Sequence, residues 1–215
     1  MVAIQTSLFA QGFGAGGDAV GTEVCFERID LGAGAWVDVA RDWLGGADSL
    51  LEDLIVGVRW GQRRRRMYDR VVDEPRLTRW YAAGAELPGR GLAAFRRSVG
   101  DHYGVEFGAV GLNYYRDGHD SVAWHADREL RRLDDTVVAI VTLGAPRPFL
   151  LRPQPGTAIP ASWRRRRSID LRPAGGDLLV MGGTCQARWE HCVPKVAGGA
   201  GPRISASIRW AGGPE

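Results

Sequence analysis

The sequence predicts an α+β protein that is mainly β, with helices in its first half and strands in its second half. Two segments of the first half carry apolar residues at the three- and four-residue spacing of an amphipathic helix. After Gly104, short runs rich in β-branched and aromatic residues recur, separated by Gly, Pro and Asp. Many short strands with turn residues between them are typical of a β-sandwich or barrel.

Two helices are expected, one starting at Asp48 and one spanning Leu92 to Tyr103. Asp48 precedes an apolar stripe and is expected to cap the first helix. In the second helix, Phe95 and Val99 share one face with Leu92. Each helix therefore has one apolar face to bury against the rest of the protein.

The other segments are assigned from turn residues and β propensity. The first 35 residues are rich in Gly and Ala and are expected to cover the surface, while residues 61–70 (GQRRRRMYDR) are expected to form a polar loop. The expected strands of the second half lie near residues 108–116, 121–126, 136–143, 147–152, 167–172, 177–182, 187–193 and 203–210. Since no linker separates these segments, we expect a single domain over residues 1–215.

Composition excludes several classes of protein. The 215 residues are 45% hydrophobic and 25% charged, as in an ordinary globular protein, and eight Trp argue against disorder. No apolar run is long enough to span a bilayer, and the first residues lack the basic region of a secretory signal. Three cysteines without a CxxC pair suit a reducing compartment, so we expect a cytoplasmic protein. We also expect a monomer that does not contact a membrane.

The basic residues are strongly skewed toward arginine. Lys195 is the only lysine among 28 basic residues, although the formal net charge is only +3. A coding bias toward Arg, Ala and Gly explains such a skew. The alternative is anion recognition, because a guanidinium binds carboxylate and phosphate better than an ammonium does.

A candidate metal site is formed by His125, Asp127 and His191. His125 and Asp127 form an H-x-D motif in a β-like segment, and residues i and i+2 of a strand share a face. His191 lies in another β-like run. Two histidines and one carboxylate are the ligands of the non-haem Fe(II) facial triad. The alternative for His191 is a buried core histidine.

The last β-like run, GPRISASIRW, alternates between apolar and polar residues. Its polar face carries Arg203, Ser205, Ser207 and Arg209. Two arginines on one strand face are costly to bury unless an anion meets them, and a small dicarboxylate would serve. The alternative is a solvated edge strand with its arginines pointing outward.

Asn113 and Tyr115 form a further i, i+2 pair in a predicted strand. Their amide and phenol groups could hydrogen-bond the same small acid. The alternative for both residues is packing within the core.

These residues together resemble the AlkB family of Fe(II)/2-oxoglutarate dioxygenases, which are oxidative dealkylases of nucleic acid bases. The resemblance rests on N-x-Y, H-x-D, a distal His and R-x-S-x-S-x-R in the family's order, between about Trp60 and Trp210. The segments EPRLTRWYA, DSVAWHADRE, LGAPRPFLLR and GDLLVMGG are also similar to the branch that contains the vertebrate DNA and RNA repair members.

The resemblance implies a double-stranded β-helix, or jelly roll, as the core over about residues 106–211. It implies a nucleotide-recognition lid and a supporting helix over about residues 60–105. By position, His125, Asp127 and His191 would bind Fe(II). O2 and 2-oxoglutarate would be the cosubstrates, and succinate, CO2 and an aldehyde the products.

The remaining site residues also follow from the resemblance. Arg203 would pair with the distal carboxylate of 2-oxoglutarate, and Arg209 would help to hold the carboxylate end of 2-oxoglutarate that lies near iron. Asn113, Tyr115 and Ser205 would complete that pocket, with Ser205 standing where the family usually has Asn. Glu129 would face the alkylated base.

The predicted substrate is alkylated nucleic acid, either single-stranded or with its target base flipped out of a duplex. The base would pack on Trp80 and Tyr81, for which core burial is the alternative. The arginines expected at phosphates are Arg63, Arg64, Arg65 and Arg66, together with the block Arg164 to Arg167. A solvated charge run is the alternative for both blocks.

Two other functions stay open on the sequence alone. The first is a 2-oxoglutarate oxygenase that acts on tRNA, a protein or a small molecule. The second is a non-catalytic module that binds a metal or nucleic acid.

Overall fold

The computed structural model describes residues 3–7, 24–67, 69–163 and 167–212. The first-half strands are β1 (Ala3–Ser7), β2 (Val24–Gly32), β3 (Ala35–Ala40), β4 (Arg64–Met67), β5 (Arg70–Asp73) and β6 (Leu77–Tyr81). The second-half strands are β7 (Val110–Tyr115), β8 (Val122–His125), β9 (Thr136–Gly144), β10 (Leu150–Pro153), β11 (Ile169–Asp170), β12 (Leu178–Gly183), β13 (Trp189–Val193) and β14 (Arg203–Ala211). The helices are α1 (Ala47–Gly57), α2 (Arg90–Tyr103), α3 (Cys185–Arg188) and a 3-10 turn at Ala161–Trp163.

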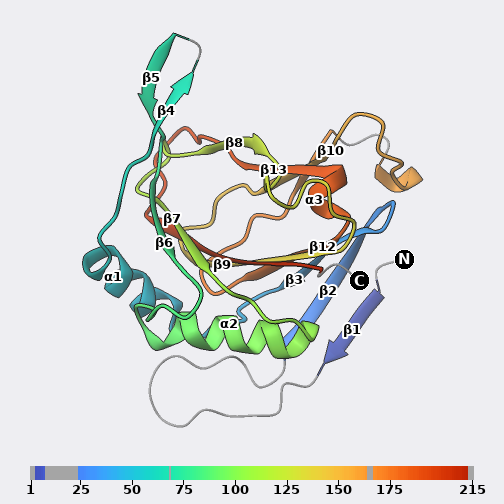
Figure 1. Ribbon diagram of the computed structural model, residues 1–215, viewed down its shortest axis with the longest axis horizontal. Coiled ribbons are helices and arrows are strands. Elements are labelled where there is room, and N and C mark those ends of the chain that lie inside the picture. The colour runs from blue at the N-terminus through green and yellow to red at the C-terminus, as the bar shows by residue number, and fades with distance from the viewer. Residues whose placement is uncertain (1–2, 8–23, 68, 164–166, 213–215) are drawn as a thin grey trace.

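Three layers make up the fold (Figure 1). The large sheet has the order β1-β2-β3-β12-β9-β14-β7-β6, and the small sheet has the order β11-β10-β13-β8. Helices α1 and α2 cover one face of the large sheet, while the small sheet lies over its other face. All strand pairs in both sheets are antiparallel. This arrangement confirms the predicted mainly-β jelly roll.

Alternation along the strands divides the apolar residues into two cores. Ile204 and Ile208 of β14 face the helices, where they join Leu54 and Phe95 in one buried cluster. The second cluster fills the space between the two sheets and includes Leu151 of β10. Polar residues of β14 point into that second space, which places the candidate site between the sheets.

The two long helices lie over the ranges that their apolar spacing predicts, but α1 begins differently. Gly46 is the N-cap residue in a left-handed conformation, and no side chain caps this helix. Asp48 lies within the first turn instead, which corrects its predicted role as the cap. A carboxylate in that turn still interacts favourably with the positive end of the helix dipole.

The first half contains more strand than the sequence suggests. Strands β1 and β2 lie at one edge of the large sheet, so the weakly patterned first 35 residues contain two strands that the sequence did not predict. β3 pairs with both β2 and β12, and the side chains of Val37 and Val39 are buried between the sheets. Residues 8–23, which supply much of the Gly-rich pattern, lie outside the described residues.

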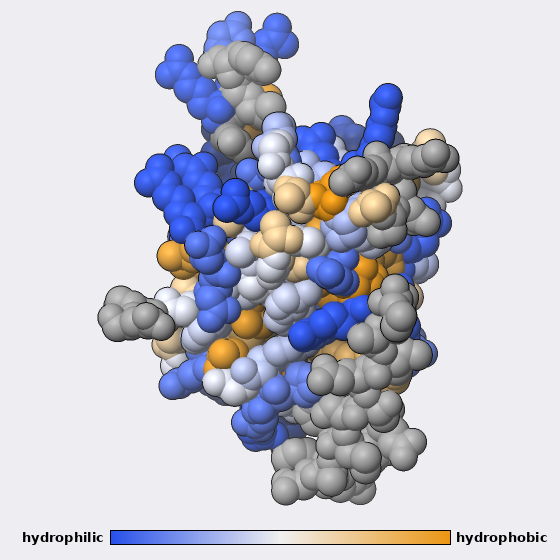
Figure 2. Space-filling view, turned by 90° about the vertical axis from the view of Figure 1, so that its right-hand side faces the viewer, coloured by the Kyte–Doolittle hydropathy of each residue, from blue (hydrophilic) through white to orange (hydrophobic). Residues whose placement is uncertain are grey.

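A two-stranded hairpin replaces the polar loop expected over residues 61–70. Strands β4 and β5 pair with Arg64 opposite Asp73 and belong to neither large nor small sheet. The hairpin projects from the body of the protein at the top of Figure 1, and Figure 2 shows hydrophilic residues over its surface. None of the described helices is long and apolar enough to cross a membrane.

Candidate metal centre

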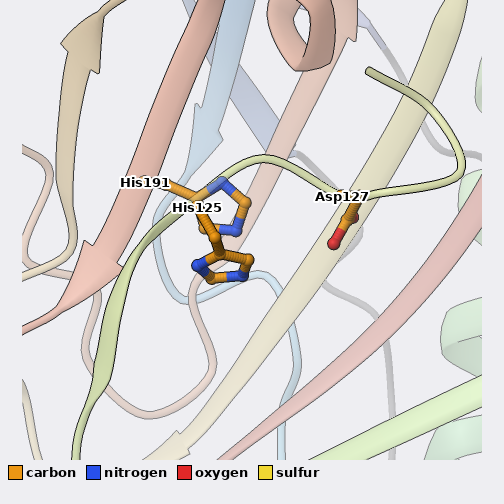
Figure 3. A group of neighbouring side chains, drawn as sticks. All are labelled: His125, Asp127 and His191. Carbon is orange, nitrogen blue, oxygen red and sulfur yellow. The ribbon is translucent and has the colours of Figure 1, made fainter. Parts of the chain in front are cut away.

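Two histidines and an aspartate meet between the sheets. His125 ends β8 and His191 lies in β13, and these residues are opposite each other in the antiparallel register. Their ring centroids are 4.2 Å apart, and Asp127 lies in the loop that follows β8 (Figure 3). One nitrogen or oxygen atom from each side chain lies within 4.8 Å of the others. The structure thus brings together the three residues that the sequence singles out.

The contacts of the two histidines suit coordination. Nδ1 of His125 lies 2.9 Å from the carbonyl oxygen of Ala123. A neutral ring whose Nδ1 donates to this carbonyl offers Nε2 as its metal-binding nitrogen. Burial lowers the pKa of His191 to about 3, so its imidazole is neutral at neutral pH. Phe149 stacks on this ring with centroids 5.4 Å apart.

Asp127 is buried and ionised. Burial by itself would raise the pKa of this carboxyl group, but the Arg209 guanidinium holds the pKa below its ordinary value. Nε of Arg209 donates to Oδ2 at 2.8 Å, and its Nη2 donates to Oδ1 at 3.2 Å. Two imidazoles and a carboxylate are a donor set that suits Fe(II), so the residues fit that ion.

Arg203 is a fully buried cation at the start of β14. β14 lies between β9 and β7, so it is not the solvated edge strand considered as an alternative. Among the described residues, the guanidinium donates to hydroxyl and carbonyl oxygens alone, at 3.3–3.5 Å. Burial lowers its pKa to about 10. A buried guanidinium with such long bonds favours an anionic ligand beside it.

Asn113 and Tyr115 lie beside this cation. In the register of β7 and β14, Tyr115 is opposite Arg203 and Asn113 is opposite Ser205. Burial raises the pKa of the Tyr115 phenol, so this group keeps its proton. Oδ1 of Asn113 accepts a hydrogen bond of 3.0 Å from Arg76, which orients the amide. Four of the five predicted anion-pocket residues therefore form one polar strip on the inter-sheet face of the large sheet, and Arg209 lies further along β14.

Neighbouring residues of β6 point to opposite faces. Trp80 pairs with Gly111 of β7, so it lies on the inter-sheet face and is 53% exposed. A Cβ atom on Gly111 would come within 3.0 Å of the indole, so this ring rests against bare backbone. Tyr81 pairs with Val110 and packs against the core below the helices. The structure therefore does not bring Tyr81 to the site.

Charged residues occur next to the triad. Glu129 is exposed in the turn that follows Asp127. A cavity of about 290 Å³ opens beside His125, and its other lining residues are Ala126, Arg131, Gln154 and Glu190. The walls of this cavity are thus polar and carry both signs of charge.

The hairpin arginines are exposed and remain a prediction. Arg63, Arg64 and Arg66 are exposed, and Arg64 forms a 3.5 Å ion pair with Asp73. The side chain of Arg65 and the whole of Arg164 to Arg166 lie outside the described residues.

Two buried polar residues near the site were not predicted. Arg147 donates to the carbonyl oxygens of Asp117, Asp120 and Pro194, in the loops before β8 and after β13. Gln186 of α3 accepts a hydrogen bond from the backbone N–H of the aspartate in the triad. Both act on backbone atoms of distant segments, so no sequence spacing marks either residue.

Comparison with known proteins agrees with this geometry. Residues 54–209 match the family model of the 2OG-Fe(II) oxygenase superfamily. The chain is 31% identical over 177 residues to the mouse protein named alpha-ketoglutarate-dependent dioxygenase alkB homolog 3, covering 76% of this chain and 61% of that protein. It is 36% identical over 120 residues to the DNA oxidative demethylase ALKBH2 of Arabidopsis thaliana, covering 49% and 38% of the two chains.

These relatives are longer than the matched region, which spans less than two thirds of their length. A solved structure also shares the fold. It is a prolyl hydroxylase of Trichoplax adhaerens in complex with a hypoxia inducible factor peptide, with a TM-score of 0.55 at 11% identity. The superposition covers 81% of this chain and 83% of that chain.

Proposed function

Because this chain belongs to the 2OG-Fe(II) oxygenase superfamily, we propose that it removes N-alkyl groups from nucleic acid bases. The AlkB resemblance of the sequence is confirmed by its alkB homolog relatives. The observation that carries the proposal is the pairing of a metal-ligand triad with a buried, weakly bonded Arg203 on facing sheets. A metal and a small dianion can be bound together in that space.

The cofactors follow from the family and from the site. His125, Asp127 and His191 would hold Fe(II). Bound iron would supply the reaction of O2 with 2-oxoglutarate, which gives succinate and CO2 and hydroxylates the alkyl group that leaves as an aldehyde. Arg203 binds the distal carboxylate, assisted by the neighbouring phenol of Tyr115.

Arg209 has a separate role in this scheme. Its guanidinium orients Asp127 through two hydrogen bonds and carries positive charge at the end of the pocket nearest the triad. The Asn113 amide and the Ser205 hydroxyl line the pocket between the two arginines. Excluding water from this buried strip strengthens each of these charged contacts.

Nucleic acid is the substrate class that the outer surface favours. Exposed Trp80 provides an aromatic face on the site side of the sheet, where a flipped base can stack. The projecting hairpin presents Arg63, Arg64 and Arg66 to phosphates. Glu129 would favour bases that carry a positive charge, such as N1-methyladenine and N3-methylcytosine. Those bases pair poorly and cost less to extrude.

The closest alternative keeps the oxygenase chemistry and changes the substrate to tRNA, a protein or a small molecule. The arginine-rich hairpin and the exposed indole favour a nucleotide over those substrates. A non-catalytic binding module is the other alternative. It offers no reason for a fully buried cation on the sheet that faces the metal ligands.

One experiment tests the proposal. Methylated DNA and RNA oligonucleotides, single- and double-stranded, are incubated with the protein, Fe(II), 2-oxoglutarate and ascorbate, and analysed by mass spectrometry. We expect the mass of one methylene unit to be lost, with matching succinate formation, and neither with His125→Ala. Succinate without any change in the oligonucleotides would point to another substrate, and no succinate would support a binding module.

We further propose that the protein works as a monomer in the cytoplasm. The three cysteines, all free, suit a reducing compartment. Size-exclusion chromatography with light scattering tests the oligomeric state, and fractionation of the source cells tests the compartment.

A further inference from the structure

The three candidate metal ligands are not held in the same way. His125 and His191 lie in paired strands, so the β8–β13 hydrogen bonds fix both backbones. Asp127 lies beyond the end of β8, in a segment with no strand partner. Its backbone position must therefore be set by contacts outside the sheet ladder.

The backbone N–H of Asp127 makes one long-range contact. It donates a 2.8 Å hydrogen bond to Oε1 of Gln186, which lies 59 residues later in α3. Gln186 is 1% exposed, and its Nε2 lies 3.9 Å from the sulfur of Met181. The strong contact of this buried amide is thus the one to the aspartate.

The position of Gln186 in the chain adds to this contact. Helix α3 ends at Arg188 and leads directly into β13, so Gln186 lies five residues before His191. One rigid segment therefore supplies a histidine ligand and also holds the backbone of the aspartate ligand. On the other side, Arg209 holds the carboxylate.

We propose that Gln186 is a positioning residue that fixes the Asp127 loop relative to the two histidines and so sets the metal affinity of the site. This inference rests on the proposed assignment of iron to the triad. Without Gln186 the buried N–H has no acceptor, and the loop must be ordered when the metal binds. Residues that orient metal ligands in this way typically contribute 10- to 100-fold to metal affinity.

The test compares loss of the Gln186 side-chain amide with loss of its weak contact to Met181. Gln186→Leu removes the acceptor at similar volume, and Gln186→Met, which offers only a weak thioether acceptor, is the second variant if the first does not fold. Met181→Leu is the matched control, because it removes only the long contact to Nε2 within the same buried cluster. Mn(II) binding to the full chain without 2-oxoglutarate is measured by electron paramagnetic resonance.

We expect the Kd for Mn(II) to rise about tenfold in the Gln186 variants and to stay within about twofold of the wild type in Met181→Leu. A packing role alone would lower the melting temperatures with and without Mn(II) equally and leave the Kd unchanged, which would overturn the proposal. Asp127→Ala tests the assignment of the metal ligands separately from the positioning role of Gln186. If it also keeps the wild-type Kd, the triad assignment itself is wrong.

Discussion

The inter-sheet site and the β4–β5 hairpin are built on opposite principles. Between the sheets, charged side chains are buried and held by groups from distant segments, as Asp127 is held by Arg209. In the hairpin, four-residue strands pair only with each other, and Arg64 and Asp73 are 72% and 61% exposed. The proposed reaction chemistry thus lies in the buried interior, and the proposed phosphate contacts lie on an exposed hairpin that pairs with neither main sheet.

The free-energy cost of placing an arginine side chain differs between the two regions. Arg203 is fully buried and has no carboxylate partner within ion-pair distance among the described residues, so removing it from water is costly. Arg64 keeps its hydration, and its ion pair is expected to contribute about 0–1 kcal/mol. We therefore expect an anion to bind strongly beside Arg203, and a phosphate to bind weakly and with a dependence on salt beside Arg64.

The largest effect is expected from removing the aspartate ligand. Asp127→Ala deletes a proposed metal ligand and leaves Arg209 without its carboxylate, so turnover should fall by about 10³-fold or more. Succinate release measures this loss. Asp73→Ala in the hairpin is the control and should leave substrate-free turnover of 2-oxoglutarate unchanged. Equal losses of succinate release in Asp127→Ala and Asp73→Ala would contradict the assignment of the reaction chemistry to the inter-sheet site.

Arg203→Met should weaken the binding of 2-oxoglutarate without lowering the stability of the fold. Loss of a buried charge partner typically costs about 2–5 kcal/mol, so the KM for 2-oxoglutarate should rise by about 30-fold or more. Without cosubstrate, the variant should be at least as stable as the wild type, because an unpaired buried cation is replaced by an apolar group. Steady-state kinetics and thermal melts measure the two outcomes. A much lower melting temperature with an unchanged KM would contradict both.

The stability of the metal-free protein should depend on pH through His191. Burial lowers the pKa of His191 from 6.5 to about 3, so the unfolded chain binds a proton that the folded chain excludes. Stability from this group is full above pH 6.5 and is lost as the pH falls toward 3, by about 1.4 kcal/mol per pH unit. Urea unfolding with chelator present measures the slope. His191→Leu should flatten it, and an equal slope in that variant would exclude His191 as its source.

The smallest effects are expected in the hairpin. Single changes of Arg63, Arg64 or Arg66 to Ala should reduce the salt dependence of oligonucleotide binding by about one unit of slope each. Folding stability should change by less than about 0.5 kcal/mol, because these side chains are exposed. Fluorescence anisotropy at several salt concentrations measures the slope. If all three variants keep the wild-type slope, the hairpin does not contact phosphate.

The part of the inter-sheet site on β14 and β7 could be predicted from sequence because strand alternation is strict there. Asp127 lies beyond β8, so the i, i+2 strand spacing used for the H-x-D motif does not describe its position. The i, i+2 spacing places Arg203 and Ser205 on one face, and the register with β7 adds Asn113 and Tyr115. The same rule separates Trp80 from Tyr81, although it could not be applied before β6 was known to be a strand. Gln186 could not be predicted, because its hydrogen bond depends on how two distant loops meet.

The first half was harder to predict for physical reasons. A run of arginines hides the two-residue alternation of β4, because both of its faces are polar and apolar spacing gives no signal. The position of β3 next to β12 depends on pairing across about 140 residues, which no local pattern encodes. The β-rich second half has an apolar face on most strands, and there each predicted strand overlaps a strand of the structure. The prediction is wrong at residues 187–188, which end helix α3.

Gly111 sets how close the Trp80 indole lies to the large sheet. Its missing side chain lets the indole lie directly on β7, and a methyl group there would meet the ring at 3.0 Å and Ser207 at 3.2 Å. Adding that single carbon would force the indole or the Ser207 side chain to shift by a few tenths of an ångström. The position of this aromatic face is therefore set by a residue outside the proposed metal and cosubstrate ligands.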